Sequence, residues 1–376
     1  MKMKKVSRNF GASSSEYNFP AMIKPVPPEA KFSDPDYFTW CGSVVKDTRG
    51  RCHLFYSRWP KKFGFNAWVT HSEVAHAIAD CPLGPYRHVD VALPARGPQF
   101  WDGLVTHNPT VIQARDGKFY LYYMGTRGND IHAVAPSNEY APSLRDENDL
   151  VEQARNHPLN WDFRNKQRIG VAVADSPEGP WRRFDEPLIA PTPGFHDALC
   201  CNNPSVVEWC GDSARETAPK PRYLMVYKAV GENVPLPFGG PVVHCVATSE
   251  NPTGPFEKHP NPIFVKEGIH FAAEDPFAWC DGQFYWAIVK DMGGNFTGES
   301  KSLALFCSED GYDWKPAKNA LVTTIDIKWA EGNGEDLLFL DRPQLYHENG
   351  KPVALFCAAM NAKADTFNVH IPLESL

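Results

Sequence analysis

The sequence repeats one strand–turn–strand unit five times. Four copies begin with a polar pair and a proline, and continue as a short strand, a polar or glycine turn and a second alternating strand. They read THNPTVIQARDGKFYLYYMGT, CNNPSVVEW with PRYLMVYKAV, AEDPFAWCDGQFYWAIVKDM and LDRPQLYHENGKPVALFCAAM. A weaker copy, TWCGSVVKDTRGRCHLFYSRW, precedes them. The anchor positions, 67 to 95 residues apart, are Gly42, Pro109, Pro204, Pro276 and Pro343.

A second signature follows the first three copies and predicts two further strands in each unit. It reads AIADCPLGPYRHV, AVADSPEGPWRRF and VATSENPTGPFEKH, with a looser FCSEDGYDWKPA after the fourth copy. We interpret it as a third strand, a proline–glycine turn and a fourth strand with an aromatic residue. Each unit is then a four-stranded antiparallel meander. Five such units predict an all-β fold, a five-bladed β-propeller with a central channel.

The whole sequence, 1–376, is therefore expected to form one domain. The blades are predicted near residues 37–93, 104–190, 199–265, 272–322 and 339–372. The fifth unit lacks the aromatic turn, so we expect the N-terminal segment to supply its missing strand and close the ring. The long second spacing predicts a polar, helix-capable insertion in blade two, at 127–166.

The charge of the sequence argues against some classes of binding partner. The formal net charge of −7 argues against nucleic acid or an anionic membrane. No apolar stretch approaches the roughly 18 to 20 residues that span a bilayer, and the basic N-terminus lacks an apolar signal region. We therefore expect a cytoplasmic protein, or a secreted or periplasmic one if a leader has been removed. The ten cysteines form no metal motif and are expected to be mostly reduced core residues. The sequence leaves the oligomeric state open.

The polar pairs before the anchors predict a functional site. A single such pair is typical of a turn, but recurrence at one position of successive repeats favours a ring of side chains around the channel. Because neighbours alternate along a strand, one residue of each pair is expected to face the channel. The five pairs are Trp40–Cys41, His107–Asn108, Asn202–Asn203, Glu274–Asp275 and Asp341–Arg342.

Three carboxylates in this ring suit acid and base work on a hydroxyl-rich ligand. Glycoside hydrolysis requires a protonated acid for the leaving oxygen and an ionised base or nucleophile opposite it. Crowded carboxylates raise one another's pKa, so one of them can stay protonated near neutral pH. Glu274, Asp275 and Asp341 are the candidates.

The five-unit layout, with EDPF and DRPQL opening consecutive inner strands, resembles the five-bladed propeller glycoside hydrolases. These include families 43, 32, 62, 117 and 130, with the 43/117-like group nearest. The resemblance covers about residues 30 to 372. It implies an exo-acting, inverting glycosidase acting on a short oligosaccharide, with carboxyl groups about 6.5 to 9.5 Å apart. No cofactor is expected to be required, although propellers of this kind can hold a structural divalent cation in the channel.

The resemblance also implies residue roles. Asp275 matches the carboxylate that orients substrate and tunes the acid. Asp341 matches the general acid in position but is shorter than the usual Glu, so Glu274 is an alternative acid. The positions of the family's base hold no acid here, and the nearest candidate is Asp102 of FWDGLVTHNP. Asp34 or Asp36, and the weaker candidate Asp197 in the similar FHDALCCNNP, are alternatives for the base.

Further side chains are expected to bind substrate. These predicted substrate-binding residues are Trp40, Arg58, His107, Asn108, Asn203, Lys290 and Arg342. No metal ligand set is assigned. Two other functions stay open: a glycoside phosphorylase, which needs cations for phosphate, and a non-catalytic glycan-binding propeller.

Overall fold

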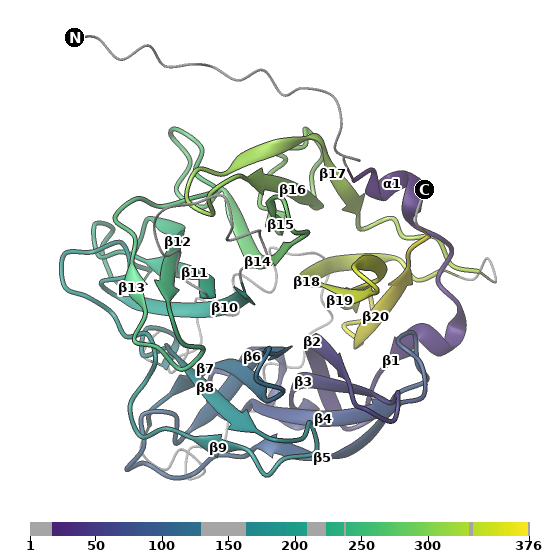
Figure 1. Ribbon diagram of the computed structural model, residues 1–376, viewed down its shortest axis with the longest axis horizontal. Coiled ribbons are helices and arrows are strands. Elements are labelled where there is room, and N and C mark those ends of the chain that lie inside the picture. The colour runs from purple at the N-terminus through teal and green to yellow at the C-terminus, as the bar shows by residue number, and fades with distance from the viewer. Residues whose placement is uncertain (1–16, 129–162, 209–222, 237, 331–333, 375–376) are drawn as a thin grey trace.

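Five antiparallel sheets of four strands stand around a central axis in the computed structural model of the protein (Figure 1). This architecture confirms the five-bladed prediction. The structure describes residues 17–128, 163–208, 223–236, 238–330 and 334–374. Most of the insertion predicted for blade two therefore lies outside the described residues.

Each of the first four blades is a meander of consecutive strands, and the innermost strand comes first. Blade one comprises β2 (Tyr37–Lys46), β3 (Cys52–Pro60), β4 (Glu73–Ala79) and β5 (Arg87–Leu93). Blade two comprises β6 (Val105–Gln113), β7 (Phe119–Thr126), β8 (Arg168–Ala174) and β9 (Arg182–Arg183). Blade three comprises β10 (Cys200–Glu208), β11 (Tyr223–Val230), β12 (Val242–Ser249) and β13 (Glu257–Lys258). Blade four comprises β14 (Ala273–Cys280), β15 (Tyr285–Asp291), β16 (Ser302–Ser308) and β17 (Lys315–Thr324).

Blade five joins the two ends of the described residues. Its first three strands are β18 (Leu337–Glu348), β19 (Lys351–Asn361) and β20 (Thr366–Pro372). The fourth is β1 (Lys31–Phe32), which pairs antiparallel with β20 through Lys31 opposite Val369. The N-terminal segment thus completes blade five, which packs against blades four and one and closes the ring.

Short helices occupy the connections. The structure contains the helices α1 (Phe19–Met22) and α2 (Trp68–His71) and the 3₁₀ turns η1 (Pro28–Ala30), η2 (Lys61–Phe63) and η3 (Phe65–Ala67). The segment η2–η3–α2 joins the second and third strands of blade one, and its aromatic residues reach the axial cavity described below.

The core lies between neighbouring blades. Tyr122 and Val171 of blade two, for example, pack in one cluster with Met225 and Cys245 of blade three. Each large apolar side chain buried in this way stabilises the fold by about 1.5–3 kcal/mol. None of the cysteines that the structure describes forms a disulfide, and this includes the adjacent Cys200 and Cys201.

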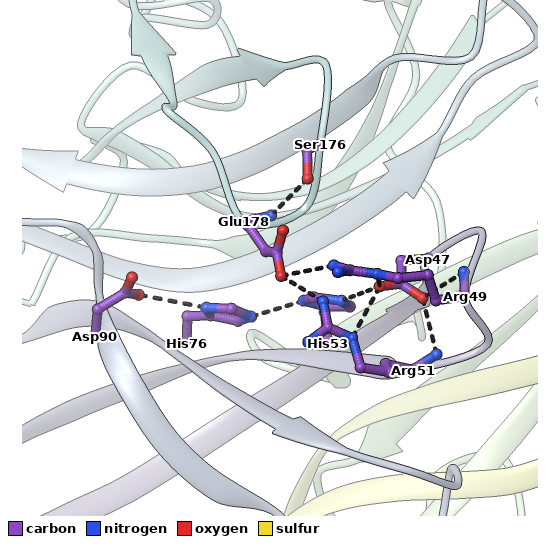
Figure 2. A network of polar contacts seen from close by, with 8 residues as sticks. All are labelled: Asp47, Arg49, Arg51, His53, His76, Asp90, Ser176 and Glu178. Atoms are coloured by element: carbon purple, nitrogen blue, oxygen red, sulfur yellow. Dashed lines mark hydrogen bonds and ion pairs between the residues drawn. The ribbon is translucent and has the colours of Figure 1, made fainter.

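A polar network also joins blades one and two (Figure 2). Arg49 and Arg51 of the β2–β3 turn donate to Glu178, which follows β8 in blade two. Both arginines also donate to Asp47. Two imidazoles continue the network from Asp47 across blade one towards its outermost strand. Asp47 contacts His53 of β3, His53 contacts His76 of β4, and His76 contacts Asp90 of β5.

Candidate active site

A cavity of about 180 Å³ lies at the axis, where the innermost strands of the blades begin. Its lining residues come from all five blades. They are Trp40, Trp59, Phe65, Trp68, His107, Asn108, Arg164, Gln167, Asn202, Asn203, Lys228, Glu274, Asp275, Asp341 and Arg342.

The backbone at each pair differs from a regular strand. The second residue of all five pairs has a left-handed conformation, with φ between 50° and 55°, and the register shifts at the same place in every blade. Such a bulge removes the usual alternation of side chains. Both Glu274 and Asp275 therefore line the cavity, which corrects the expectation that only one of them would.

The left-handed conformation costs little for Asn and Asp but is strained for other residues. Cys41 and Arg342 nevertheless adopt it, with φ of 50° and 53°. Backbone strain that persists in a fold is concentrated at functional sites, so this geometry supports a functional role for the ring.

The second residues of the pairs form a closed polar ring around the axis. Cys41 Sγ donates to Asn108 Oδ1 over 2.7 Å, and Asn108 donates to Asn203. Asn203 Nδ2 donates to Asp275 Oδ1 over 2.7 Å. Arg342 donates to the same carboxylate from its backbone N (3.2 Å) and Nη1 (3.3 Å), and its guanidinium lies beside the Cys41 thiol. One residue of every blade is thus fixed to its neighbours.

The first residues of four pairs have polar partners of their own. His107 Nδ1 pairs with Ser72 Oγ over 2.7 Å, and Asn202 Nδ2 donates to Gln167 Oε1 over 2.7 Å. The two acids are paired with lysines. Glu274 forms an ion pair with Lys228, and Asp341 Oδ1 lies 2.8 Å from Lys290 Nζ.

These surroundings give the acids different pKa values. Burial by itself would raise the pKa of Glu274, but the charges of Lys228 and Lys290 outweigh it and hold that pKa at about 2. Burial raises the pKa of Asp341 to about 7; Lys290 opposes this increase and the charge of Asp275 adds to it. Burial and the charge of Glu274 also raise the pKa of Asp275. Near neutral pH the cavity therefore contains an ionised Glu274 and a readily protonated Asp341.

A wall of aromatic side chains lines another part of the cavity. Trp68 stacks on His107, with ring centroids 5.0 Å apart, and Trp59 contacts the same imidazole edge-on. Trp40 packs against Phe65, which also contacts Trp59. Burial lowers the pKa of His107 well below its usual value, so the imidazole is neutral. Aromatic faces of this kind suit the apolar face of a sugar ring.

The structure brings most of the sequence-predicted residues together. Those that line the cavity are Trp40, His107, Asn108, Asn203, Glu274, Asp275, Asp341 and Arg342. Lys290 reaches the site through its ion pair with Asp341.

Asp102 lies outside the cavity lining, in a fully buried ion-pair cluster. Its carboxylate accepts hydrogen bonds from Arg96 Nε (2.6 Å), Tyr123 Oη (2.7 Å) and Arg183 Nη1 (3.3 Å). Asp197 has a parallel environment in blade three, where Tyr227 and Lys258 donate to it. Both carboxylates therefore fix a loop to the second and fourth strands of their blade.

Arg58 and the two acids near β2 also point elsewhere. Arg58 Nε donates to Glu73 over 2.9 Å, and its guanidinium lies over the Tyr37 ring. Asp34 Oδ1 accepts the backbone N–H groups of Asp36 and Tyr37, so this segment is a turn before the strand. Asp34, Asp36 and Arg58 are therefore not among the residues that line the cavity.

Several lining residues were not predicted. Phe65, Trp68, Arg164 and Gln167 lie in connections between strands, where the repeat offers no alignment. For Lys228 the sequence did contain a signal. The segment PRYLMVYKAV aligns with GQFYWAIVKDM, and this alignment places Lys228 at the position of Lys290.

Neither a candidate metal cluster nor a membrane-spanning helix occurs in the described part of the protein. Its residues contain no group of three or more His, Cys, Asp or Glu side chains that could hold a metal ion. None of its helices is long and apolar enough to cross a membrane.

Comparisons with known proteins define the fold. No protein-family model matches the sequence, and no curated protein matches it. Among solved structures, a complex of BT0996 with RGII superposes with a TM-score of 0.64 at 16% identity, covering 95% of this protein and 94% of that one. The protein has the fold of the five-bladed glycoside hydrolases.

Two further solved structures, both of glycoside hydrolases, have the same fold. The family 117 glycoside hydrolase Zg3597, produced by the marine bacterium Zobellia galactanivorans, has a TM-score of 0.55 at 16% identity, covering 90% of this protein and 85% of that one. A thermostable family-43 glycoside hydrolase has a TM-score of 0.56 at 12% identity, covering 94% and 93%. The predicted resemblance to families 43 and 117 is thus confirmed at the level of fold.

Proposed function

We propose that this protein is a glycosidase that removes a terminal sugar from a short oligosaccharide. One observation carries the proposal: the axial cavity contains the carboxyl groups of Glu274, Asp275 and Asp341, and its surroundings shift the pKa values of Glu274 and Asp341 in opposite directions. Carboxyl groups with separated pKa values are what acid/base hydrolysis of a glycosidic bond requires. The fold supports the same class but does not by itself fix the function.

In the proposed mechanism Asp341 is the general acid. Its carboxyl group donates a proton to the glycosidic oxygen as the bond to the sugar breaks. Glu274 remains ionised and removes a proton from the attacking water. Asp275, held by Asn203 and Arg342, contributes negative charge that helps Asp341 to keep its proton until substrate binds.

The aromatic wall completes the site. A sugar ring stacked on Trp68 and the neighbouring tryptophans would turn its hydroxyl groups towards the charged residues of blades three to five. The cavity volume of about 180 Å³ favours one terminal sugar over a long internal stretch of polysaccharide. We therefore propose exo-action. We also propose inversion of configuration, in which the acid and base carboxyl groups are about 6.5–9.5 Å apart and leave room for the attacking water.

The test is turnover of a panel of aryl glycosides and short oligosaccharides by the wild-type protein and by Glu274→Gln and Asp341→Asn. We expect one glycoside class to be hydrolysed, with a bell-shaped pH profile, and NMR of the first-formed anomer to show inversion. Activity that survives both substitutions in folded protein would overturn the acid/base mechanism. If no turnover is found but a glycan binds, glycan binding without catalysis would be the better description.

Phosphorolysis is the second candidate, because Lys228, Lys290 and Arg342 place positive charge beside the carboxylates. Such charges suit phosphate as the attacking group in place of water. Assays with and without inorganic phosphate distinguish the two: a sugar phosphate product that forms only with phosphate would replace hydrolysis by phosphorolysis.

A further inference from the structure

Two lysines occupy the same position in consecutive blades. In the strand pairing, Lys228 lies opposite Asn202 in blade three, and Lys290 lies opposite Glu274 in blade four. Each faces the first residue of its own blade's polar pair. Each nevertheless forms its ion pair with the acid of the following blade, Lys228 with Glu274 and Lys290 with Asp341.

The other three blades show that this placement is selective. The equivalent residues are Ser57 in blade one, Met124 in blade two and Ala358 in blade five. The next blade around the ring then opens with His107, Asn202 or Trp40, respectively. A cation is therefore present at this position only in the two blades that precede an acid.

The two ion pairs are not equivalent. Glu274 contacts Lys228 and also lies opposite Lys290 in its own blade, so two ammonium groups favour its ionised form. Asp341 contacts Lys290 but is close to the negative charges of Asp275 and Glu274. Lys290 acts on both carboxyl groups, whereas Lys228 adds a second positive charge beside Glu274. Glu274 is therefore held in its ionised form more firmly than Asp341.

We propose that Lys228 and Lys290 are positioning residues that give the two carboxyl groups opposite tasks: Lys228 dedicates Glu274 to the role of base, and Lys290 limits how firmly Asp341 keeps its acidic proton. This assignment rests on the proposed glycosidase function for its kinetic consequences, but the charge relationships it describes exist in the protein without substrate.

The kinetic test compares Lys228→Met and Lys290→Met, which keep much of each side chain's volume and remove its charge. An opposite charge within about 4–6 Å shifts a carboxyl pKa by about 1–3 units. Lys228→Met should move the acidic limb of the pH profile of kcat up by about 1–3 pH units, because Glu274 then binds its proton more tightly. Lys290→Met should move the basic limb upwards, because Asp341 then keeps its proton to higher pH, and should move the acidic limb upwards less than Lys228→Met does, because Glu274 keeps its ion pair with Lys228.

Lys258→Met is the matched control. Lys258 is another largely buried lysine that forms an ion pair with an aspartate, Asp197, but it lies outside the cavity. Its loss should lower stability and leave both limbs in place. Lys290→Arg, which retains the charge, should restore the basic limb towards that of the wild type. Limbs that do not move, or that move as far in Lys258→Met, would overturn the proposal.

A second readout separates this proposal from the glycosidase function. Carbon-13 NMR titration of the side-chain carboxyl groups, assigned with Glu274→Gln and Asp341→Asn, follows both groups without any substrate. Because the titration needs no turnover, it can also be applied to a methionine variant that is too weakly active to assay. If a methionine variant does not fold, Lys228→Gln or Lys290→Gln takes its place. If these titrations shift as stated but no glycoside is hydrolysed, the lysine roles stand and the glycosidase proposal fails. If wild-type turnover is found and the titrations do not shift, the lysine proposal fails alone.

Discussion

Asn203 Nδ2 donates a hydrogen bond to Asp275 Oδ1 over 2.7 Å and thereby joins blades three and four at the propeller axis. Arg342 binds the same carboxylate from blade five through its backbone N and Nη1. Asp275 is thus the acceptor on which three donors from two neighbouring blades converge. Its charge is both part of the candidate site and part of the closure of the ring.

Replacing this carboxylate should destabilise the protein. Asp275→Asn leaves the buried Arg342 guanidinium without its counter-charge, and breaking a buried ion pair from one side costs about 3–5 kcal/mol. We expect a loss of that order in the free energy of unfolding, measured by urea denaturation. Asp313→Asn, which removes an exposed pair with Lys315, should change it by less than about 1 kcal/mol. Equal stabilities for the two variants would contradict the closed-ring interpretation.

The general acid is expected to show a leaving-group dependence. Asp341→Asn should lower kcat/KM by about 10²- to 10⁴-fold on glycosides with poor leaving groups, because general acid catalysis contributes about that much. It should have a small effect on dinitrophenyl glycosides, whose leaving group needs no proton. The measurement is the slope of log kcat/KM against leaving-group pKa.

Asp102→Asn provides the contrasting variant for that series. Asp102 is held by Arg96, Tyr123 and Arg183 outside the cavity, so its loss should lower stability without steepening the leaving-group dependence. A steep dependence in Asp102→Asn and a flat one in Asp341→Asn would make Asp102, and not Asp341, the general acid.

The repeat made the fold predictable from the sequence. Strands, turns and anchors recur with local signals, so the ring of five blades and the axial position of His107, Glu274 and Asp341 followed from alignment of the copies. The left-handed backbone at the second residue of each pair did not follow. That conformation depends on the packing of five blades at the axis, so the sequence pattern suggested simple alternation where both residues face the cavity.

Ion-pair partners were the least predictable part of the site. Asp102 precedes a polar pair in the sequence and so was expected near the axis, but donors from Arg96, Tyr123 and Arg183 hold it away from the cavity. Lys228 and Glu274 are 46 residues apart and meet only because their blades are neighbours. Such partners depend on the spatial arrangement of side chains that no local pattern records.

A buried imidazole pair in blade one should make stability depend on pH. His53 Nδ1 and His76 Nε2 lie 2.9 Å apart in buried positions (Figure 2). Burial lowers the pKa of His53, and it lowers that of His76 from 6.5 to about 4. A folded-state pKa below the unfolded value means that the unfolded protein binds more protons. The stability contribution is therefore full above about pH 6.5 and is lost as the pH falls towards 4.

The check is the free energy of unfolding of wild type and His76→Gln between about pH 7.5 and 4. The difference between the two should shrink or change sign in favour of the variant as the pH falls, since glutamine cannot take up the proton. His259→Gln, which alters a half-buried imidazole stacked on Tyr312, is the control and should follow the wild-type curve more closely. Parallel curves for wild type and His76→Gln would rule out this pair as a source of acid sensitivity.

The aromatic wall should contribute to binding more than to chemistry. Trp68 stacks on His107 at the edge of the cavity and carries none of the charges that act on the glycosidic bond. Losing one aromatic stacking contact costs about 0.5–1.5 kcal/mol, so Trp68→Ala should raise KM by about 2- to 12-fold with kcat nearly unchanged. Trp181→Ala removes a tryptophan that packs edge-on against Phe55 outside the cavity, and its KM should match the wild type. A fall in kcat at constant KM in Trp68→Ala would instead mean that the indole orients His107 for the reaction.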